Sequence, residues 1–495
     1  MSCKRLSIIL LCLVPMVVKA QVFNPLDYGL MEATSDSARY NVLLATHEAA
    51  VAAEGSISYS GIDSINIAFP KGAKSLPLAK NNDFAGAVVT VTNNQSDIVL
   101  YLMYRGAQNI DISAEVIESG DFSSVPQLAV GNHLLLLDDR EPWVGERIGY
   151  SYPFYRRDVL LISNGKALNR QVAPYNTAAT RLKTTFCDID TMPKRVENLV
   201  VVRSKASTFK TYAVAIYNSD NVTLQNIKVI TPKSKMTADG TIAANGCTRL
   251  KLHDIDIQGT YSARGKYGYA FSMNNLWNVE FKQVRATGKW GVFGTNNMSQ
   301  VLLEECEVNR FDIHCYGKDV VLRNCRLSDK QTQFSSMYGK VLFDHCEFIN
   351  TIPLRIRASY NAYTPFDIEF HKCRFVATRR YHSLVNVMLL DTNLNARPEL
   401  SEKCWPNVTI DTMEVDLQGV RNINIYNPTG TLSELSKKVG HIDKVEIQGL
   451  QLNRRGKQYN RATLNISDKK VTTTTPVKVQ ITSTNAQEIK RGFEE

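Results

Sequence analysis

An eight-residue pattern, apolar-x-apolar-x-x-apolar-x-apolar, recurs along the chain. It reads VTLQNIKV from Val222, VVLRNCRL from Val320 and IEFHKCRF from Ile368, and further copies begin at Leu250, Val279, Val301, Val341, Val408 and Val445. The starts are 28, 29, 22, 19, 21, 27, 40 and 37 residues apart. Each copy holds two stretches of period 2, which is typical of strands, joined by a two-residue break where the register shifts by one.

The spacing of the copies favours a coil of parallel strands over a sheet of hairpins. Asn-Gly and Asp-Gly turns, which join paired strands in hairpins, are scarce in this region. A leucine-rich repeat has a similar period, but its asparagine-bearing consensus and helical segment are absent. We therefore predict an all-β fold, a single-stranded right-handed parallel β-helix (a solenoid), in which the longer spacings are loops inserted at the bends.

Four cysteines share one slot of consecutive copies, namely Cys306, Cys325, Cys346 and Cys373. Other copies fill this slot with Ile227, Ile255, Val284, Met413 and Leu450. Such a slot is typical of a core column, in which cysteine acts as a small hydrophobic residue. We expect buried, reduced thiols, although strands about 4.8 Å apart would also permit a disulfide. Zinc binding by these cysteines is not expected, because the chain has no CxxC motif and His345, next to Cys346, should point away from the core.

The first 20 residues have the layout of a secretory signal peptide. Lys4 and Arg5 precede an apolar run of about a dozen residues, and small residues place the expected cleavage near Ala20. The run is shorter than the roughly 20 apolar residues of a transmembrane span, and no later segment is apolar enough for one. We therefore expect a secreted, periplasmic or cell-surface protein without a membrane span.

Charge points to an anionic partner. The net charge of +10 falls to +7 without the signal segment, which holds Lys4, Arg5 and Lys19 but no acidic residue. For an exported protein this balance favours an acidic polysaccharide over nucleic acid as the partner, with a merely basic surface as the alternative. Ten cysteines include two in the signal segment, and a chain of 495 residues buries enough core to need no disulfide framework.

Residues 21–90 are predicted to cap the solenoid and lead into its first turns. Ser35 or Asp36 can begin a helix over about residues 37–53, which would cover the open end of the coil. Its expected packing stripe comprises Val42, Leu43, Thr46, Ala49 and Ala50. The segment resembles the start of the pectate-lyase-like superfamily, since Asp27-Tyr28-Gly29, a capping helix and Phe69-Pro70-Lys71-Gly72 match, whereas LMEATSDSA replaces its glycine- and aspartate-rich loop. The resemblance implies a lyase-type β-helix but leaves the chemistry open, because lyases, hydrolases, epimerases and phage tailspikes share this fold.

The remaining chain divides into a β-helix with inserted loops over residues 91–460 and closing strands with a tail over residues 461–495. Residues 134–185 fit no turn and are predicted to border a groove, where Trp143 and Tyr155 could stack on sugar.

A third, less regular strand precedes each copy and is predicted to form the floor of this groove. Alignment of these strands gives an outward column of three asparagines and three tyrosines, namely Asn245, Asn274, Asn296, Tyr316, Tyr338 and Tyr360. In a second outward column His314 is the one large residue among Ala243, Ser272, Gly294, Ser336 and Ala358. The alternatives are an asparagine ladder at a bend and ordinary surface aromatics.

These residue types suit β-elimination from a uronate. That reaction needs the sugar carboxylate neutralised, a base for the C5 proton and an acid for the leaving oxygen. The predicted catalytic residues are His314, Tyr316, Tyr338 and Arg310, and the residues predicted to bind substrate are Lys289, Asn274, Asn296, Arg355 and Tyr360. The set resembles the His/Tyr chemistry of glycosaminoglycan and alginate lyases.

Two other functions stay open. A glycoside hydrolase needs two carboxylates about 5 to 9.5 Å apart, and the predicted floor contains none; of the polygalacturonase motifs only Arg355-Ile356-Arg357 is faintly similar. A non-catalytic glycan-binding protein or adhesin would use the same tyrosines for stacking. No metal or cofactor is predicted, and Ca²⁺ stays open without a recognised motif. A monomer and a homotrimer both fit the sequence.

Overall fold

The computed structural model describes residues 21–93, 98–104, 106–139, 156–170, 182–203, 212–231, 241–259, 269–286, 291–314, 317–335, 337–357, 366–388, 406–429, 444–455, 463–465, 478–482, 484–486 and 488–490. The predicted signal peptide lies outside these residues, as do Trp143 and Tyr155. Within the described part of the chain, no helix has the length and apolar character needed to cross a membrane.

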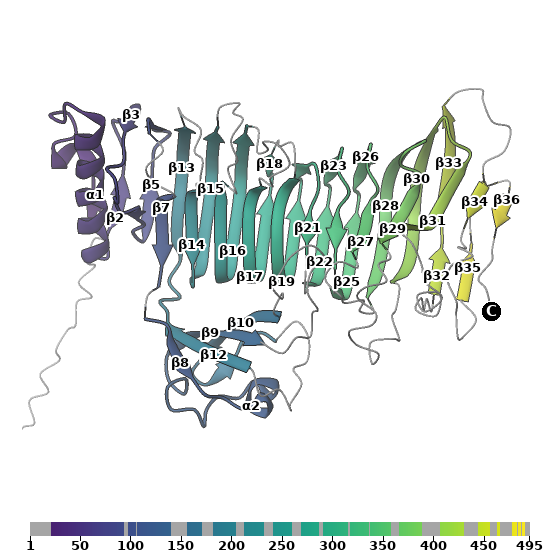
Figure 1. The fold of residues 1–495 in the computed structure, drawn as a ribbon, viewed down its shortest axis with the longest axis horizontal. Coiled ribbons are helices and arrows are strands. Elements are labelled where there is room, and N and C mark those ends of the chain that lie inside the picture. The colour runs from purple at the N-terminus through teal and green to yellow at the C-terminus, as the bar shows by residue number, and fades with distance from the viewer. Residues whose placement is uncertain are drawn as a thin grey trace, which may run out of the picture.

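The protein is an all-β solenoid of stacked parallel strands, as the repeat predicts (Figure 1). The large sheet comprises β1 (Val22–Phe23), β2 (Ser56–Ser58), β3 (Ser64–Ile67), β4 (Leu76–Pro77), β5 (Asn81–Asp83), β6 (Val88–Val91), β7 (Ile98–Met103), β13 (Lys194–Arg203), β14 (Tyr212–Tyr217), β15 (Asp220–Ile230), β16 (Ile242–Gln258), β17 (Tyr269–Lys282), β18 (Arg285–Ala286), β19 (Gly291–Glu304), β20 (Glu307–Val308), β22 (Gly317–Arg323), β23 (Arg326–Ser328), β25 (Met337–Asp344), β26 (Glu347–Ile349), β28 (Asp367–Thr378), β30 (Asn407–Gln418), β32 (Lys444–Ile447), β33 (Leu450–Arg455) and β35 (Lys478–Ile481). A second parallel sheet comprises β21 (Asp312–Ile313), β24 (Gln333–Phe334), β27 (Leu354–Arg357), β29 (Ser383–Met388), β31 (Asn422–Thr429), β34 (Thr463–Asn465) and β36 (Glu488–Lys490).

The predicted repeats stack in register. Strand pairing aligns their first residues in one column, which runs through Val222, Leu250, Val279, Val301, Val320, Val341, Ile368, Val408 and Val445. All of these side chains are buried in the main hydrophobic core. Inward apolar residues at equivalent positions of successive turns therefore build the continuous core of the coil.

The two-residue break inside the repeat is a bend, and in eight of the nine copies one of its residues lies in the left-handed region. The backbone angle φ is positive at Asn226, Asp254, Gln283, Glu305, Asn324, His345, Lys372 and Thr412, and also at Asn198 of β13. One left-handed residue turns the chain without a hairpin, so that the apolar residues on both sides of the bend enter the same core. Asparagine and aspartate recur here because they tolerate this conformation better than most residues.

The cysteine column lies in the core, as predicted. Cys306, Cys325, Cys346 and Cys373 are buried and unpaired, and each thiol donates to a backbone carbonyl, as Cys346 does to Leu322 O at 3.2 Å. Burial, together with hydrogen bonds to Cys325 and Cys373, raises the pKa of Cys346 well above its usual value. The Cys346 thiol is therefore protonated at neutral pH and acts as a small hydrophobic side chain.

A helix covers the first turns of the coil (Figure 1). The 3-10 helix η1 (Pro25–Tyr28) is followed by α1 (Asp36–Ala52). Ser35 is the N-cap of α1, and its hydroxyl accepts a hydrogen bond from Ala38 N at 3.1 Å. Leu43, Thr46 and Ala50, three residues of the predicted packing stripe, are fully buried. The predicted capping helix is confirmed, with its ends shifted by one residue.

A small separate sheet lies between β7 and β13 in the sequence. It comprises β8 (Gln108–Ile110), β9 (Asn132–Asp139), β10 (Arg156–Ser163), β11 (Lys166–Ala167) and β12 (Leu182–Asp188), all antiparallel, with helix α2 (Ala114–Ser119). It has an apolar cluster of its own and projects from one side of the solenoid (Figure 1). The region that fits no turn of the repeat thus forms most of this insert.

Candidate functional site

In the turn that contains β21, the third strand presents three charged or titratable side chains on its outer face. Phe311 and Ile313 point into the core, where the ring of Phe311 lies 5.0 Å from that of Phe293. Because side chains alternate along a strand, Arg310, Asp312 and His314 point to the opposite face. We call these three residues the outer triad.

The outer triad is centred on an ion pair between Arg310 and Asp312, with His314 beside it. The Arg310 guanidinium pairs with Asp312 Oδ2, and His314 Nε2 lies 3.4 Å from the same oxygen. The other oxygen, Asp312 Oδ1, accepts a hydrogen bond from Gln333 N at 3.1 Å. The exposed fractions are 4% for Arg310, 0% for Asp312 and 7% for His314, so the triad is nearly excluded from solvent although it lies on the outer face.

The register of this strand differs from the sequence prediction by two residues. His314 N donates to Thr295 O at 2.9 Å, which in a parallel ladder places His314 beside Asn296 and Asp312 beside Gly294. The alignment that placed His314 beside Gly294 was wrong, because it matched Tyr316, four positions before Val320, with Asn296, five positions before Val301. In the structure His314, six positions before Val320, takes that place.

The same shift corrects the tyrosine column. Tyr338 pairs with Lys318, and Lys318 pairs with Ser299, so Tyr338 does not continue the column of Asn296. Tyr316, Tyr360 and Lys289 lie outside the described residues. The structure therefore brings His314 together with Arg310 and does not bring Tyr338 into their strand.

A column of asparagines runs along the floor and ends beside His314. Asn245, Asn274 and Asn296 occupy one column, and Asn296 Nδ2 donates to Asn274 Oδ1 at 2.8 Å. This is the asparagine ladder that the sequence left open as an alternative to substrate binding. The side chains of Asn274 and Asn296 are half-buried, so they border the triad without being enclosed.

The sequence reasoning missed Tyr269. Its ring lies edge-on to His314, with centroids 6.2 Å apart. A Cβ atom on Gly294 would lie 2.5 Å from the Tyr269 ring, so the absence of a side chain at Gly294 makes room for this ring. Tyr269 starts β17 outside the aligned columns, and the small residue at Gly294 was the only signal that could have pointed to it.

Arg355 lies in the same column as Asp312. Asp312 pairs with Gln333, and Gln333 pairs with Arg355, so Arg355 lies two strands further along the floor than Asp312. It is half-buried, whereas Arg310 is buried and pairs with Asp312. The expectation that the outward columns hold no carboxylate was wrong, because the corrected register places Asp312 in one of them.

The insert borders this floor. Arg157 N, on β10, donates to Asn297 Oδ1 at 3.4 Å, directly after Asn296. Leu134, Val159 and Leu161 of the insert form an apolar cluster against which Trp277 of β17 packs. The insert therefore contacts the coil beside the asparagine column, and the groove that the sequence predicts there stays a prediction.

Comparisons with known proteins identify the fold. No protein-family model matches the chain, and no curated protein sequence matches it. The structure is similar to the tailspike protein of Pseudomonas phage LKA1, with a TM-score of 0.54 and 12% identity over 90% of this chain and 80% of that chain. A tailspike of Pseudomonas phage phi297 has a TM-score of 0.48 and 12% identity over 88% and 80% of the two chains. The likeness to the first tailspike concerns the fold, which is that of a parallel β-helix protein.

Proposed function

We propose that the protein is a lyase that cleaves a uronic-acid-containing acidic polysaccharide by β-elimination on the outer face around β21. The observation that carries the proposal is the buried outer triad of Arg310, Asp312 and His314. The net charge of the chain without the predicted signal segment, +7, favours an anionic polymer as substrate. Export through the predicted signal peptide would bring the protein to such a polymer.

The burial of the triad supports a functional role. Removing two charged groups from water costs several kcal/mol per ion, and a buried ion pair is often no more stabilising than apolar residues of the same volume. The outer face of a solenoid imposes no requirement for burial on these side chains. An oriented imidazole beside a carboxylate is, by contrast, what proton abstraction needs.

The proposed reaction uses His314 as the base. The imidazole takes the C5 proton, the electrons of the C5–H bond form the C4–C5 double bond, and the C4–O bond to the leaving sugar breaks. Asp312 orients the imidazole and stabilises the imidazolium that forms, and Arg310 positions Asp312. Tyr269 gives a proton to the leaving oxygen, while Arg355 and Asn296 bind the sugar carboxylate.

The test is incubation of the protein with chondroitin, dermatan, heparin-like, alginate and pectic substrates while the ultraviolet absorbance of the unsaturated product is followed. We expect turnover of at least one substrate and a loss of about 10²- to 10⁴-fold in His314→Ala, the usual contribution of a general base. His253→Ala is the control, because His253 also lies beside a carboxylate, Glu280, at 3.0 Å, but on another part of the coil.

Four outcomes would contradict the proposed activity or its site. Absence of unsaturated product with every substrate refutes the lyase activity, and new reducing ends without unsaturation would indicate a hydrolase. Glycan binding without any cleavage would favour the non-catalytic alternative. If His314→Ala turns over substrate like the unaltered chain, the outer triad is not the site.

A further inference from the structure

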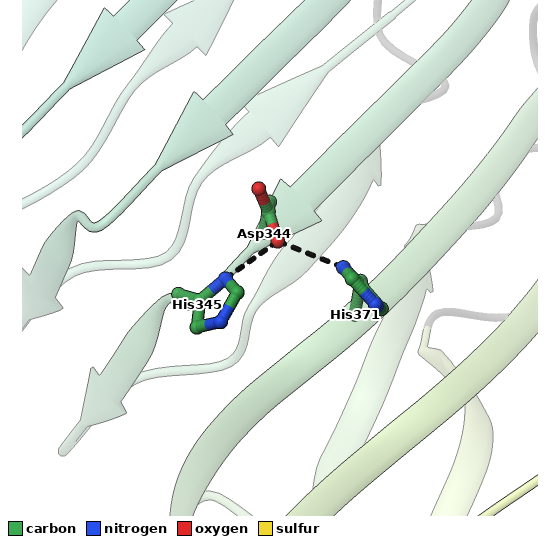
Figure 2. A group of neighbouring side chains, drawn as sticks. All are labelled: Asp344, His345 and His371. Atoms are coloured by element: carbon green, nitrogen blue, oxygen red, sulfur yellow. Dashed lines mark hydrogen bonds and ion pairs between the residues drawn. The ribbon is translucent and has the colours of Figure 1, made fainter.

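A second cluster of titratable side chains lies at a bend of the large sheet. Asp344 ends β25, His345 occupies the bend that follows, and His371 on β28 pairs with Asp344. Figure 2 shows both imidazoles directed at the same carboxylate oxygen, with His345 Nδ1 2.7 Å and His371 Nδ1 2.8 Å from Asp344 Oδ1. Side chains that are 26 residues apart in sequence thus converge on one point.

The local backbone turns these side chains toward solvent. His345 has a φ of 53°, and the next residue, Cys346, enters the core. Cys373 does the same two residues after His371. The exposed side-chain fractions are 47% for His345, 36% for His371 and 15% for Asp344, so an ion from solution can reach the cluster.

We propose that Asp344, His345 and His371 bind a divalent transition-metal ion of the zinc class. Two imidazole nitrogens and one carboxylate oxygen are ligands that Zn²⁺ prefers, and the three donor atoms lie within 4.8 Å of one another. Bonds of about 2.0–2.1 Å in a tetrahedral site hold ligand atoms roughly 3.3 Å apart. The two Nδ1 atoms, now 2.7 and 2.8 Å from Asp344 Oδ1, therefore need to move about half an ångström away from this oxygen, which the exposed side chain of His345 allows. A water molecule would fill the fourth position.

The groups behind the ligands support this assignment. Arg323 Nε lies 3.2 Å from Asp344 Oδ2, the oxygen that faces away from the imidazoles. Asp411 Oδ2 lies 3.1 Å from His371 Nε2, the nitrogen that faces away from Asp344. A carboxylate on the far nitrogen of a histidine is the usual support of a metal-binding imidazole, since it fixes the tautomer and the ring orientation.

An ion-pair ladder without metal explains only part of the cluster. Lys282, Glu304, Arg323, Asp344, His371 and Asp411 occupy one column in which positive or protonatable and negative residues alternate. In such a ladder His371 would serve as a cation between Asp344 and Asp411. His345 lies outside this column, in the bend. The alternation of charges in the ladder therefore does not explain why a second imidazole contacts Asp344.

The test is a calorimetric titration of the untagged full chain with ZnCl₂ after removal of metals with a chelator. We expect saturable binding of one ion at this site, together with visible absorption of tetrahedral type when Co²⁺ replaces Zn²⁺. His345→Asn, which tolerates the positive φ, and His371→Gln should each abolish this binding. Asp411→Asn should weaken it about 10- to 100-fold, as changes behind a ligand do.

His253→Gln is the matched control, because His253 lies in the same column and faces one carboxylate but no second histidine. Its titration should equal that of the unaltered chain. Absence of saturable zinc binding by the unaltered chain overturns the proposal. Unchanged binding in His345→Asn also overturns it, even where His371→Gln binds less, since the site would then lack its third ligand.

Discussion

The capping helix contains a buried histidine that should make the cap sensitive to acid. His47 is fully buried in α1, with Nδ1 2.7 Å from Pro77 O and Nε2 2.8 Å from the Tyr59 hydroxyl. Burial lowers the pKa of His47 from 6.5 to about 4, against the opposing effect of the hydrogen bond to Pro77. The imidazole is therefore neutral in the folded cap at neutral pH.

The expected loss of stability follows from this difference in pKa. The unfolded chain takes up the proton at a higher pH than the folded cap, so the stability present above pH 6.5 is lost as the pH falls from 6.5 toward 4. The full difference of about 2.5 units corresponds to about 3 kcal/mol, at 1.36 kcal/mol per unit. Between pH 7 and pH 5 the loss is about 2 kcal/mol.

Native-state hydrogen exchange of the α1 amides measures this quantity as the free energy of opening of the cap. In the unaltered chain it should fall by about 2 kcal/mol between pH 7 and pH 5. In His47→Gln, which carries no titrating ring, most of this fall should vanish, whereas His253→Gln should behave like the unaltered chain. An equal fall in His47→Gln and in the unaltered chain would refute the reasoning, because another group would then be responsible.

Three further changes test other parts of the structure. Asp220→Asn should destabilise the chain by about 1.5–3 kcal/mol in urea unfolding, because the fully buried Asp220 accepts a charge-assisted hydrogen bond from Arg249, whose side chain is partly exposed; a change below about 1 kcal/mol would contradict this. Gly294→Ala should lower turnover by displacing Tyr269, since the added Cβ would lie 2.5 Å from its ring; unchanged turnover would remove Tyr269 from the mechanism. The thiol of Cys346 should resist alkylation in the native state and react after denaturation, as peptide mass spectrometry would show, because its side chain is buried; rapid native labelling would contradict the core position.

The sequence by itself determined the coil, its core and its cap. The alternation of apolar residues and the left-handed bend are local properties, so the copies that begin at Val222 and Val320 predicted their own strands and their shared column. Cys346 and its equivalents were assigned to the core by the residues that replace them in other turns. The capping helix followed from Ser35 and the packing stripe after it.

Only the tertiary structure decided what meets on the outer face. Outward residues are not constrained by the core, so the alignment placed Tyr316 beside Asn296, two residues away from the observed register, which places His314 there and Asp312 on the same face. Tyr269 reaches His314 across Gly294, and no local pattern records that contact. Asp344 and His371 occupy the same position of their repeats, so the sequence already placed them in one column, but only the structure shows that His345 turns toward the same carboxylate oxygen. The side chains of the third strand are brought together by a register that depends on loop lengths, which the repeat pattern does not specify.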